Sequence, residues 1–292
     1  MTKEQKLEFT GERFTPECVR EIWYEHYHRY AFAKNFVNNK KVLDAACGEG
    51  YGSHILAGYA KNVIGVDIDE KSILHAKEKY KKSNLKYIQA SCTKLPFDNN
   101  SFDVIVSFET LEHLAEQQQM LKEFNRVLKN DGQLMISTPD KEHYSDATGF
   151  TNEYHVKELY KDEFKTLLDT HWKNQQWYSQ AMTFNSVIEK HDSTDNRYST
   201  DILSGEKLQT NKPMLTPMYY IVLATNNSQI EFKFPDLHLF ADKQQSVYEH
   251  YNKTIKDYIY LANKYNGLIK KIDKWYSIPI LGKIIKFLEK RH

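Results

Sequence analysis

A glycine-rich turn follows a short apolar segment and could bring the backbone close to a ligand. The segment reads VLDAACGEGYGSHILA over residues 42–57, and its three glycines are Gly48, Gly50 and Gly52. Glycine has no side chain that would keep a ligand away from the backbone. A dinucleotide fingerprint, G-x-G-x-x-G, is the competing interpretation, but Ser53 stands at its third glycine position. Because Glu49 would repel a pyrophosphate, this glycine turn (residues 48–52) favours a ligand without a phosphate.

Two aspartates in the next apolar segment, GVDID, have different expected roles. Asp67 closes a predicted strand at the carboxyl edge of the sheet, where open α/β sheets bind ligands. A carboxylate there can accept hydrogen bonds from both hydroxyls of a ribose. Asp69 directly precedes the helical pattern EKSILHAKEKY and is therefore the predicted helix N-cap. Cys92 and Thr93 follow the third predicted strand, where an adenine amino group is expected.

Three histidines follow the fourth and fifth predicted strands: His113 in ETLEHL, His143 in DKEHY and His155 in NEYHV. Histidine titrates near neutral pH, so each is a candidate general base. For His113 the alternative is structural, because ETLEHL opens a helix that its polar groups can cap. Glu109 and Glu112 at the same rim are candidates to orient a base or an acceptor. No tight ligand spacing such as H-x-x-x-H is present, so no metal site is predicted. A divalent ion held by His and Glu of these loops is the less favoured alternative.

Strands, turns and helices alternate between residues 41 and 138 and would position these side chains. Five short segments rich in β-branched residues are predicted strands: 41–46, 62–67, 85–89, 102–107 and 132–138. The predicted helices between them cover residues 53–59, 70–81 and 115–128. A later helix is expected at 161–170, and later strands at 175–180 and 218–226. Such alternation builds a parallel sheet with helices on both faces, so the predicted fold class is α/β.

The chain is expected to have three parts. Residues 1–40 form an N-terminal cap segment, 41–235 a single domain, and 236–292 a helical, basic extension. Within the domain, residues 183–216 are polar and weakly patterned, and they separate the last two predicted strands. A loop of this length inside a compact domain is usually functional or disordered, so this insertion is a candidate substrate lid.

Five motifs occur in order and at normal spacing: D-x-x-C-G-x-G-x-G, GVDI, LPF, FDVIVSFETLEHL and RVLKNDGQLMISTP. Together they resemble the class I S-adenosylmethionine-dependent methyltransferases of the methyltransferase type 11-like kind, from about residue 41 to 170. The resemblance implies a seven-stranded Rossmann-like methyltransferase sheet with helices on both faces, followed by the C-terminal helical extension. It also implies S-adenosyl-L-methionine as the cofactor. The binding residues that it implies are Asp44, Ala45, Cys47, Gly48, Gly50, Asp67, Ile68, Cys92, Thr93, Phe108 and Glu109.

The flanking segments resemble a bacterial subset of this family that is associated with surface-glycan and O-antigen biosynthesis. They are FTGERFTPE, EHYHRYAFA and the stretch from ISTPDKEHYSD to NEYHVKELYKDEF. In such enzymes an N-terminal helix often closes over the cofactor. The resemblance therefore implies that Tyr27, Arg29 and Tyr30 bind the carboxylate end of the cofactor. The alternative is an ordinary surface helix with amphipathic aromatic residues.

The expected function is methyl transfer from S-adenosylmethionine to a hydroxyl of a sugar or glycan precursor in bacterial surface polysaccharide biosynthesis. Another small molecule, such as a quinone, an amine or a lipid head group, is the first alternative acceptor. A non-catalytic cofactor-binding scaffold subunit is the alternative of another class. A nucleic-acid substrate is disfavoured, because the net charge is only +1 and SFETLEH stands in place of an N-P-P-Y-like signature.

The C-terminal extension carries a heptad pattern followed by a basic end. Its apolar and aromatic positions alternate spacings of three and four: Tyr248, Tyr251, Ile255, Tyr258, Ala262, Tyr265, Ile269, Ile272 and Tyr276. We expect this seam to pack on the body of the protein, with homo-oligomerisation as the alternative. The end ILGKIIKFLEKRH is expected to be solvated, with peripheral membrane contact as the alternative.

Cysteine usage and hydropathy indicate a cytoplasmic protein. Cys18, Cys47 and Cys92 are far apart and fit neither a disulfide framework nor a zinc-knuckle spacing. The N-terminal sequence lacks the apolar stretch of a signal peptide. No apolar run approaches the roughly 20 residues of a membrane-spanning helix. If the basic end touches a membrane, the expected place is the inner membrane face.

Overall fold

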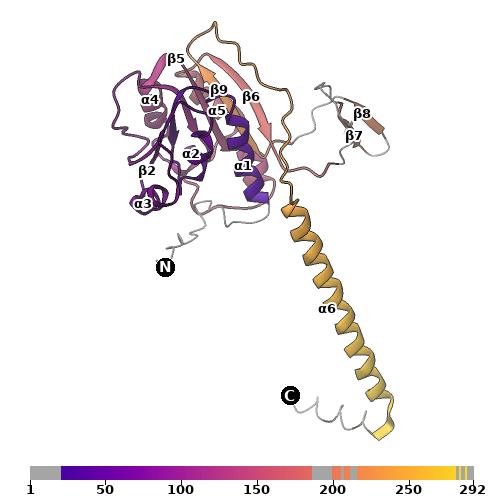
Figure 1. Cartoon of the computed structure of the whole chain (residues 1–292). Coiled ribbons are helices and arrows are strands. Elements are labelled where there is room, and N and C mark those ends of the chain that lie inside the picture. Colours follow the sequence, from indigo (N-terminus) through magenta and orange to yellow (C-terminus); the bar gives the residue numbers. More distant parts are fainter. Residues whose placement is uncertain are drawn as a thin grey trace, which may run out of the picture. The chain divides into compact units, whose positions relative to one another are not determined.

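The structure is a computed structural model, and it describes residues 21–185, 199–204, 207–210, 216–280, 283 and 287 of the 292-residue chain (Figure 1). The chain divides into two compact units, Met1–Phe240 and Ala241–His292. Several sequence predictions concern residues outside the described part: Cys18, the FTGERFTPE flank, much of the 183–216 insertion, and most of the basic end beyond residue 280.

The first unit is built on one seven-stranded sheet, in the order β3-β2-β1-β4-β5-β9-β6 (Figure 1). Its strands are β1 (Lys41–Ala45), β2 (Asn62–Asp67), β3 (Leu85–Gln89), β4 (Phe102–Ser107), β5 (Leu128–Pro139), β6 (Asn174–Gln180) and β9 (Tyr219–Thr225). Strands β1 to β5 pair in parallel, whereas β9 pairs antiparallel with both β5 and β6. The predicted α/β fold with a seven-stranded sheet is confirmed.

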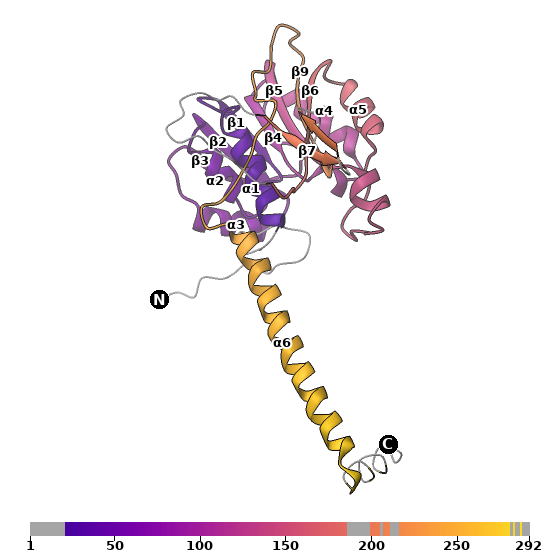
Figure 2. The same cartoon turned by 90° about the vertical axis from the view of Figure 1, so that its right-hand side faces the viewer.

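Helices cover both faces of this sheet (Figures 1 and 2). They are α1 (Glu21–Ala33), α2 (Tyr51–Leu56), α3 (Glu70–Lys79), α4 (Gln117–Val127) and α5 (Lys161–Asp169), with the single turns η1 (Leu111–His113) and η2 (Glu142–Asp146). Because alternate residues of a strand face opposite sides, Val42 of β1 packs with the helices α1 to α3. Leu43 packs on the other side with Phe124 of α4 and Phe164 of α5. Both faces are therefore buried, which explains the continuous apolar runs of the strands.

The fifth strand is longer than predicted because it contains an irregularity. The sequence predicts that Asp131-Gly132 turns the chain out of the preceding helix. In the structure β5 already begins at Leu128, which pairs with Phe102, and the register to β4 shifts between Phe102 and Val104. The Asp-Gly pair thus lies within a strand. A bulge keeps the chain paired on both sides of an insertion, and its position depends on the partner strand.

Two further elements lie in the insertion and in the second unit. The described part of the insertion forms a separate antiparallel pair, β7 (Asp201–Ser204) with β8 (Lys207–Thr210), where the sequence pattern predicts a loop. Strands of four residues are too short to give a clear periodic signal. The second unit contains helix α6 (Ser246–Ser277), which has 32 residues. Within the described residues, no helix is both long enough and apolar enough to cross a membrane.

Candidate functional site

The glycine turn joins the carboxyl end of β1 to α2, and a hydrogen bond ties it to the end of β2. Gly48 and Gly50 have φ values of 54° and 95°, in the left-handed region that favours glycine. The amide of Gly48 donates to Oδ2 of Asp67 at 2.9 Å, and the amide of Asp69 donates to Oδ1 of Asp67 at 2.9 Å. The side chain of Asp69 caps α3, which confirms the predicted N-cap. The turn and the end of β2 therefore form one backbone-lined edge.

Close packing requires two of the glycines in this turn. A Cβ on Gly50 would lie 2.6 Å from Cβ of Ala76 in α3. A Cβ on Gly52 would lie 2.0 Å from the ring of Tyr30 in α1. Gly52 belongs to helix α2, so its role is to accept the ring of Tyr30 rather than to approach a ligand.

Asp44 lies beneath the turn on β1 and is fully buried. Its carboxylate accepts hydrogen bonds from Oγ of Ser53 at 2.6 Å and from the hydroxyl of Tyr30 at 3.1 Å. Burial raises the pKa of Asp44 to about 7, although the hydrogen bonds from Ser53 and Tyr30 oppose this shift. Asp44 thus links β1 to α2 and holds α1 against the turn.

The carboxylate of Glu49 is held against α3, and this corrects the argument that it would repel a phosphate at the turn. Its side chain accepts a hydrogen bond from the hydroxyl of Tyr80 at 2.6 Å. It also lies 2.9 Å from Nε2 of His75 and 3.2 Å from Nζ of Lys79. Since Lys79 balances its charge, Glu49 does not decide which ligand the turn accepts. The features that indicate a ligand at the turn are instead the left-handed glycines and the carboxyl ends of β1 and β2.

Helix α1 is packed against the sheet and is not the ordinary surface helix that was the sequence alternative. Tyr30 and Arg29 are only 5% and 1% exposed. Nη1 of Arg29 donates to Oε1 of Gln180 at 2.8 Å and lies 3.8 Å from Oε1 of Glu109. Nε of Arg29 is buried and has no hydrogen-bond partner among the described residues. Tyr27 is only partly buried. Two of the three predicted residues of α1 therefore belong to the interior of the site.

The other predicted cofactor residues follow the carboxyl ends of β1 to β4. The buried ones are Ala45, Cys47, Cys92 and Phe108. Burial raises the pKa of Cys92 to about 12, so its thiol stays protonated at neutral pH. Thr93 is half-buried and shares a hydrogen bond of 2.8 Å with Ser91. Ile68, directly after Asp67, is 72% exposed. An exposed apolar side chain at this place is suited to cover the face of a flat ring.

The structure brings two of the three predicted catalytic histidines together. His113 ends η1 and His155 lies in the segment after η2, and their ring centroids are 5.0 Å apart. Nδ1 of His113 lies 2.9 Å from the carbonyl oxygen of Tyr154. The helix-capping alternative does not describe His113, because α4 starts without a side-chain cap. His143 is paired separately, with its Nδ1 2.5 Å from Oδ2 of Asp140.

A continuous polar rim runs along the sheet edge at the carboxyl ends of β4 and β5. It consists of Arg29, Glu109, Glu112, His113, Tyr144, His155 and Tyr219. Arg29 lies 4.9 Å from the ring centroid of Tyr219. The ring of Tyr144 lies 5.8 Å from that of Tyr219 and stacks on His155 at 5.4 Å. Residues from α1, η1, η2 and β9 are thereby joined into one surface.

Three further residues in this region, Tyr144, Tyr219 and Glu25, were not predicted from the sequence. The hydroxyl of Tyr219 donates to Oε2 of Glu25 at 3.1 Å. Burial raises the pKa of Glu25 to about 7, although the charge of Arg29 opposes the shift. Strand β9 is antiparallel, so its first residue reaches this edge. Neighbouring residues of a strand face opposite sides of the sheet. The consecutive tyrosines Tyr219 and Tyr220 could therefore have indicated a tyrosine on each side of the sheet at this edge.

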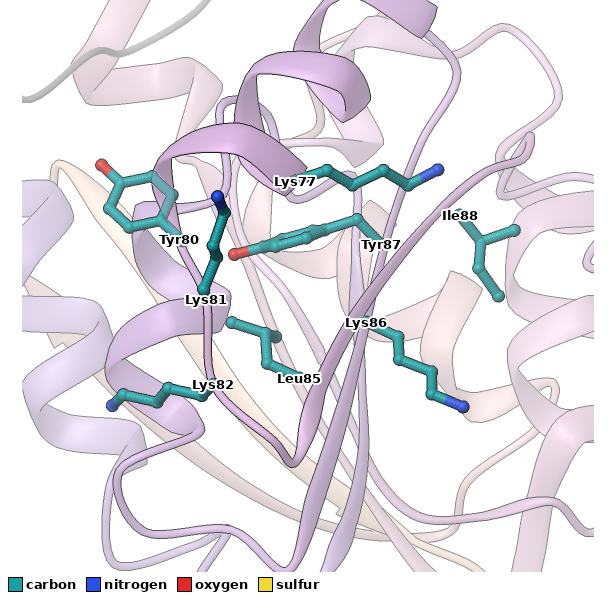
Figure 3. A pocket seen from close by; sticks show the side chains of 8 residues that line it. All are labelled: Lys77, Tyr80, Lys81, Lys82, Leu85, Lys86, Tyr87 and Ile88. Carbon is teal, nitrogen blue, oxygen red and sulfur yellow. The ribbon is translucent and has the colours of Figure 1, made fainter.

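A cavity of about 870 Å³ adjoins the polar rim. Its walls are α1, β6 and residues 236–240, and they include Arg29 and Gln180. A second cavity, of about 370 Å³, lies against the edge strand β3 (Figure 3). Its lining residues are Lys77, Tyr80, Lys81, Lys82, Leu85, Lys86, Tyr87 and Ile88. The second cavity shares no residue with the polar rim, so only the larger one belongs to the candidate site.

Comparison with known proteins shows sequence similarity over the part that contains the turn. Residues 43–136 match the model of a family described as a methyltransferase domain. The chain is 36% identical over 165 residues to a protein of Mycobacterium tuberculosis named "Probable S-adenosylmethionine-dependent methyltransferase". This match covers 56% of the chain and 60% of that protein, less than two thirds of its length. The chain is also 36% identical over 107 residues to the ubiquinone biosynthesis O-methyltransferase of Pelagibacter ubique, covering 36% of the chain and 44% of that protein.

Comparison with solved structures shows the fold. The YcgJ protein from Bacillus subtilis superimposes with a TM-score of 0.50 at 16% sequence identity, over 69% of this chain and 100% of that one. Identity this low supports a shared fold and nothing finer. The first unit therefore has the seven-stranded Rossmann-like fold of the class I methyltransferases, and its segment from β1 to β5 is similar in sequence to a methyltransferase domain.

Proposed function

We propose that this chain is an S-adenosylmethionine-dependent methyltransferase. The observation that carries the proposal is the hydrogen bond from the amide of Gly48 to Asp67, which brings the glycine turn beside the acidic end of β2. A backbone surface and a carboxylate for a ribose thus lie side by side. The match of residues 43–136 to a methyltransferase domain supports the same activity.

The residues at this edge fit the cofactor. The left-handed Gly48 and Gly50 leave the backbone uncovered by side chains. The two carboxylate oxygens of Asp67 accept backbone hydrogen bonds from Gly48 and Asp69, which fix the carboxylate at the end of β2, and a carboxylate there is the acceptor that ribose hydroxyls require. Ile68 covers one face of the adenine, and the buried guanidinium of Arg29 in α1 suits the carboxylate end. When bound, S-adenosylmethionine supplies an electrophilic methyl group, and the protein supplies position and electrostatics.

The same proposal gives roles to the other predicted residues. Cys92 and Thr93 border the adenine, and the buried ring of Phe108 packs 5.1 Å from that of Tyr30 below the methionine end. Tyr30 keeps α1 closed over the turn through its hydrogen bond to Asp44. The partly buried Tyr27 lies at the outer end of the same helix face.

Calorimetric titration with S-adenosylmethionine and S-adenosylhomocysteine tests the proposal. Asp67→Ala is expected to weaken binding by about 100-fold or more, because hydrogen bonds to a charged group contribute about 1.5–3 kcal/mol each. Asp69→Ala is the matched control, since it removes the same charge two residues away, at the cap of α3. A well-folded wild type that binds neither compound would refute the proposal.

We further propose that the acceptor is a hydroxyl of a sugar or glycan precursor in bacterial surface polysaccharide biosynthesis. The carboxylates, imidazoles and phenols of the polar rim suit a polar acceptor. The adjoining cavity of about 870 Å³ combines hydrogen-bonding groups such as Gln180 and His28 with the rings of Tyr24 and Trp177. A few placed polar groups among aromatic walls are typical of small-molecule sites.

Other acceptors are alternatives that one product assay separates. One relative is a ubiquinone biosynthesis O-methyltransferase, which favours a quinone, and an amine or a lipid head group is the further alternative. Transfer of a labelled methyl group to nucleotide sugars, to a hydroquinone and to phosphoethanolamine can be compared directly. Product from the sugar alone supports the glycan proposal. Cofactor binding without methylation of any acceptor would favour the non-catalytic scaffold.

We propose His143 as the general base for the acceptor hydroxyl. The contact between its Nδ1 and Oδ2 of Asp140 orients the ring, and its side chain is 30% exposed, against 20% for His113 and 7% for His155. A base must reach the acceptor and return its proton to solvent. His143→Gln is expected to lower kcat about 100-fold with unchanged cofactor affinity. An equal loss in His113→Gln or His155→Gln, with activity kept in His143→Gln, would move the role to that residue.

We also propose that α6 mediates homo-oligomerisation. Predicted seam residues that are exposed on this helix are Tyr248, Ile255, Tyr258, Tyr265, Ile269 and Ile272. An exposed apolar stripe at heptad spacing is suited to pack along a second helix. Light scattering coupled to gel filtration is expected to show a dimer that Tyr258→Glu dissociates. Tyr260→Glu, the same change outside the seam, should leave the dimer intact. A wild-type monomer would instead support packing of the seam on the body of the protein.

We propose that the protein is cytoplasmic and makes peripheral contact with the inner face of the membrane. The support for this proposal is the basic sequence ILGKIIKFLEKRH, which lies mostly outside the described residues. Co-sedimentation with vesicles of anionic lipid is expected, and it should disappear when residues 279–292 are deleted. Equal binding to neutral vesicles would contradict an electrostatic contact.

A further inference from the structure

Three potential metal ligands from two separate segments of the chain meet at the polar rim. One ligand atom from each of Glu112, His113 and His155 lies within 4.8 Å of the others. Glu112 and His113 belong to η1, after β4, whereas His155 belongs to the segment after η2. No short spacing in the sequence connects Glu112 and His113 with His155, which explains why no metal site was predicted from the sequence.

Both histidines already have the second contact that metal-binding histidines require. Nδ1 of His113 faces the carbonyl oxygen of Tyr154 at 2.9 Å, and Nδ1 of His155 faces Oε1 of Glu158 at 2.5 Å. A carbonyl or carboxylate oxygen can only accept, so Nδ1 carries the proton and the lone pair is on Nε2. Metal-ligating histidines usually donate their other ring N–H in this way.

Glu112 supplies an independent indication of an ion. Its side chain is 1% exposed, and its Oε2 accepts a hydrogen bond from Oγ1 of Thr138 at 3.1 Å. Its Oε1 is buried and has no hydrogen-bond partner among the described residues. This same oxygen lies 4.0 Å from Nε2 of His113. A buried carboxylate oxygen without a donor is costly, and a cation between the two groups would remove that cost.

We propose that Glu112, His113 and His155 bind one divalent transition-metal ion of the zinc class. Two imidazoles and one carboxylate are the protein ligands of open zinc sites, which leave a further position for water or substrate. Two imidazole ligands also disfavour magnesium and calcium, which prefer oxygen. Ligand atoms around a tetrahedral ion are about 3.4 Å apart for bonds of about 2.1 Å, so the observed distances of at most 4.8 Å need to close by up to about 1.4 Å. Nε2 of His155 lies 3.0 Å from Nδ2 of Asn152, and the ion would replace that amide.

A neighbouring group with two carboxylates and one histidine provides the contrast. Asp140, Glu142 and His143 also place ligand atoms within 4.8 Å of one another. Here Nδ1 of His143 already contacts Oδ2 of Asp140, and Glu142 is exposed. None of its buried oxygen atoms lacks a partner among the described residues. The second group therefore has no vacancy that an ion would fill, and it serves as an internal control.

Zinc binding by the full-length chain tests the proposal directly. After treatment with a chelator, the protein is titrated calorimetrically with zinc chloride, and separately with magnesium chloride. One zinc ion per chain is expected, with no binding of magnesium at the same concentration. Cobalt substitution adds a spectroscopic signature, because a four- or five-coordinate cobalt site absorbs strongly in the visible range. A wild type that binds no zinc, or binds it only at several weak sites, would overturn the proposal.

Matched variants assign the ligands. Glu112→Gln keeps the size of the side chain, and it should weaken zinc binding by more than the about 10- to 100-fold expected for Glu158→Gln behind His155. Glu142→Gln makes the same chemical change in the control group and should have no effect. Loss in Glu142→Gln with retention in Glu112→Gln would refute the assignment. Circular dichroism checks folding, and His155→Ala repeats the test if Glu112→Gln does not fold.

Metal binding goes beyond the proposed methyl transfer, and the two can fail separately. Glu112 is not part of the proposed cofactor edge, so Glu112→Gln should bind S-adenosylmethionine with the wild-type affinity. A chain that binds zinc but not S-adenosylmethionine would refute the methyl-transfer proposal and leave the metal site in place. A chain that binds S-adenosylmethionine but not zinc would do the reverse.

Discussion

The glycine turn and the polar rim lie along the same edge of one sheet, but their buried charged groups differ in how they are satisfied. At the turn, Asp44, Glu49 and Asp67 all accept hydrogen bonds from the protein itself. At the rim, Oε1 of Glu112 and Nε of Arg29 are buried without a partner among the described residues. A site whose groups are already held in place is preorganised, whereas buried groups without partners are stabilised when a ligand or ion arrives. The comparison indicates that the rim is completed by a group that the described residues do not supply.

Removing the buried cation of the rim should have the largest effect on stability. Arg29→Met leaves Glu109 without its buried counter-charge, so the free energy of unfolding should fall by about 3–5 kcal/mol. Lys165→Met breaks the exposed pair with Asp169 and should cost less than about 1 kcal/mol. Urea unfolding measures both variants. Equal small losses would show that the Arg29–Glu109 pair is not held in a buried environment.

Filling the space under Tyr30 should break the preorganisation of the turn. Gly52→Ala places a Cβ 2.0 Å from the ring of Tyr30, so α1 must shift, and we expect a loss of about 1–3 kcal/mol. Gly267→Ala makes the same change in α6, where no atom lies within 4 Å of the added Cβ. It should stabilise that helix by up to about 1 kcal/mol. Thermal unfolding compares the two, and an unchanged Gly52→Ala protein would contradict the packing of α1 on the turn.

A pH series compares two buried carboxyls, that of Asp44 beneath the glycine turn and that of Glu25 beside the polar rim. The pKa of Asp44 rises from 3.8 to about 7 and that of Glu25 from 4.5 to about 7 in the fold, with Asp67 facing the first and Arg29, Glu109 and Glu21 the second. The native protein then binds more protons than the unfolded chain between about pH 4 and 7. Stability should therefore fall as the pH rises through this window and level off above it. Each group contributes at most about 1.4 kcal/mol per pH unit.

Two isosteric variants separate these contributions. Asp44→Asn should remove the contribution of Asp44 to the pH dependence of the free energy of unfolding. Glu25→Gln should remove the contribution of Glu25. Urea unfolding between pH 4 and 8 gives both slopes. A variant that keeps the wild-type slope would show that its carboxyl titrates near the ordinary pKa. A steeper slope would mean that the sign of the shift is wrong.

Local elements near the turn were predictable from short stretches of sequence. Strands β2 and β4 have the predicted bounds, and Asp69 caps α3 as its position before the helical pattern indicates. A cap and an apolar strand depend on neighbours within a few residues, so their signal is local. The irregular start of β5 and the β7–β8 pair were not predicted. Both depend on the strand that pairs with them, which the local pattern does not contain.

The sequence by itself determined the order of strands and helices, the glycine turn, and the acidic residue at the end of β2. Only the tertiary structure decided which side chains meet. It turned Glu49 toward α3, placed Tyr219 against Glu25, and gathered Glu112 and His113 with His155. These contacts join different elements of the fold. Their geometry follows from how helices and strands pack as whole bodies, and no spacing along the chain records that packing.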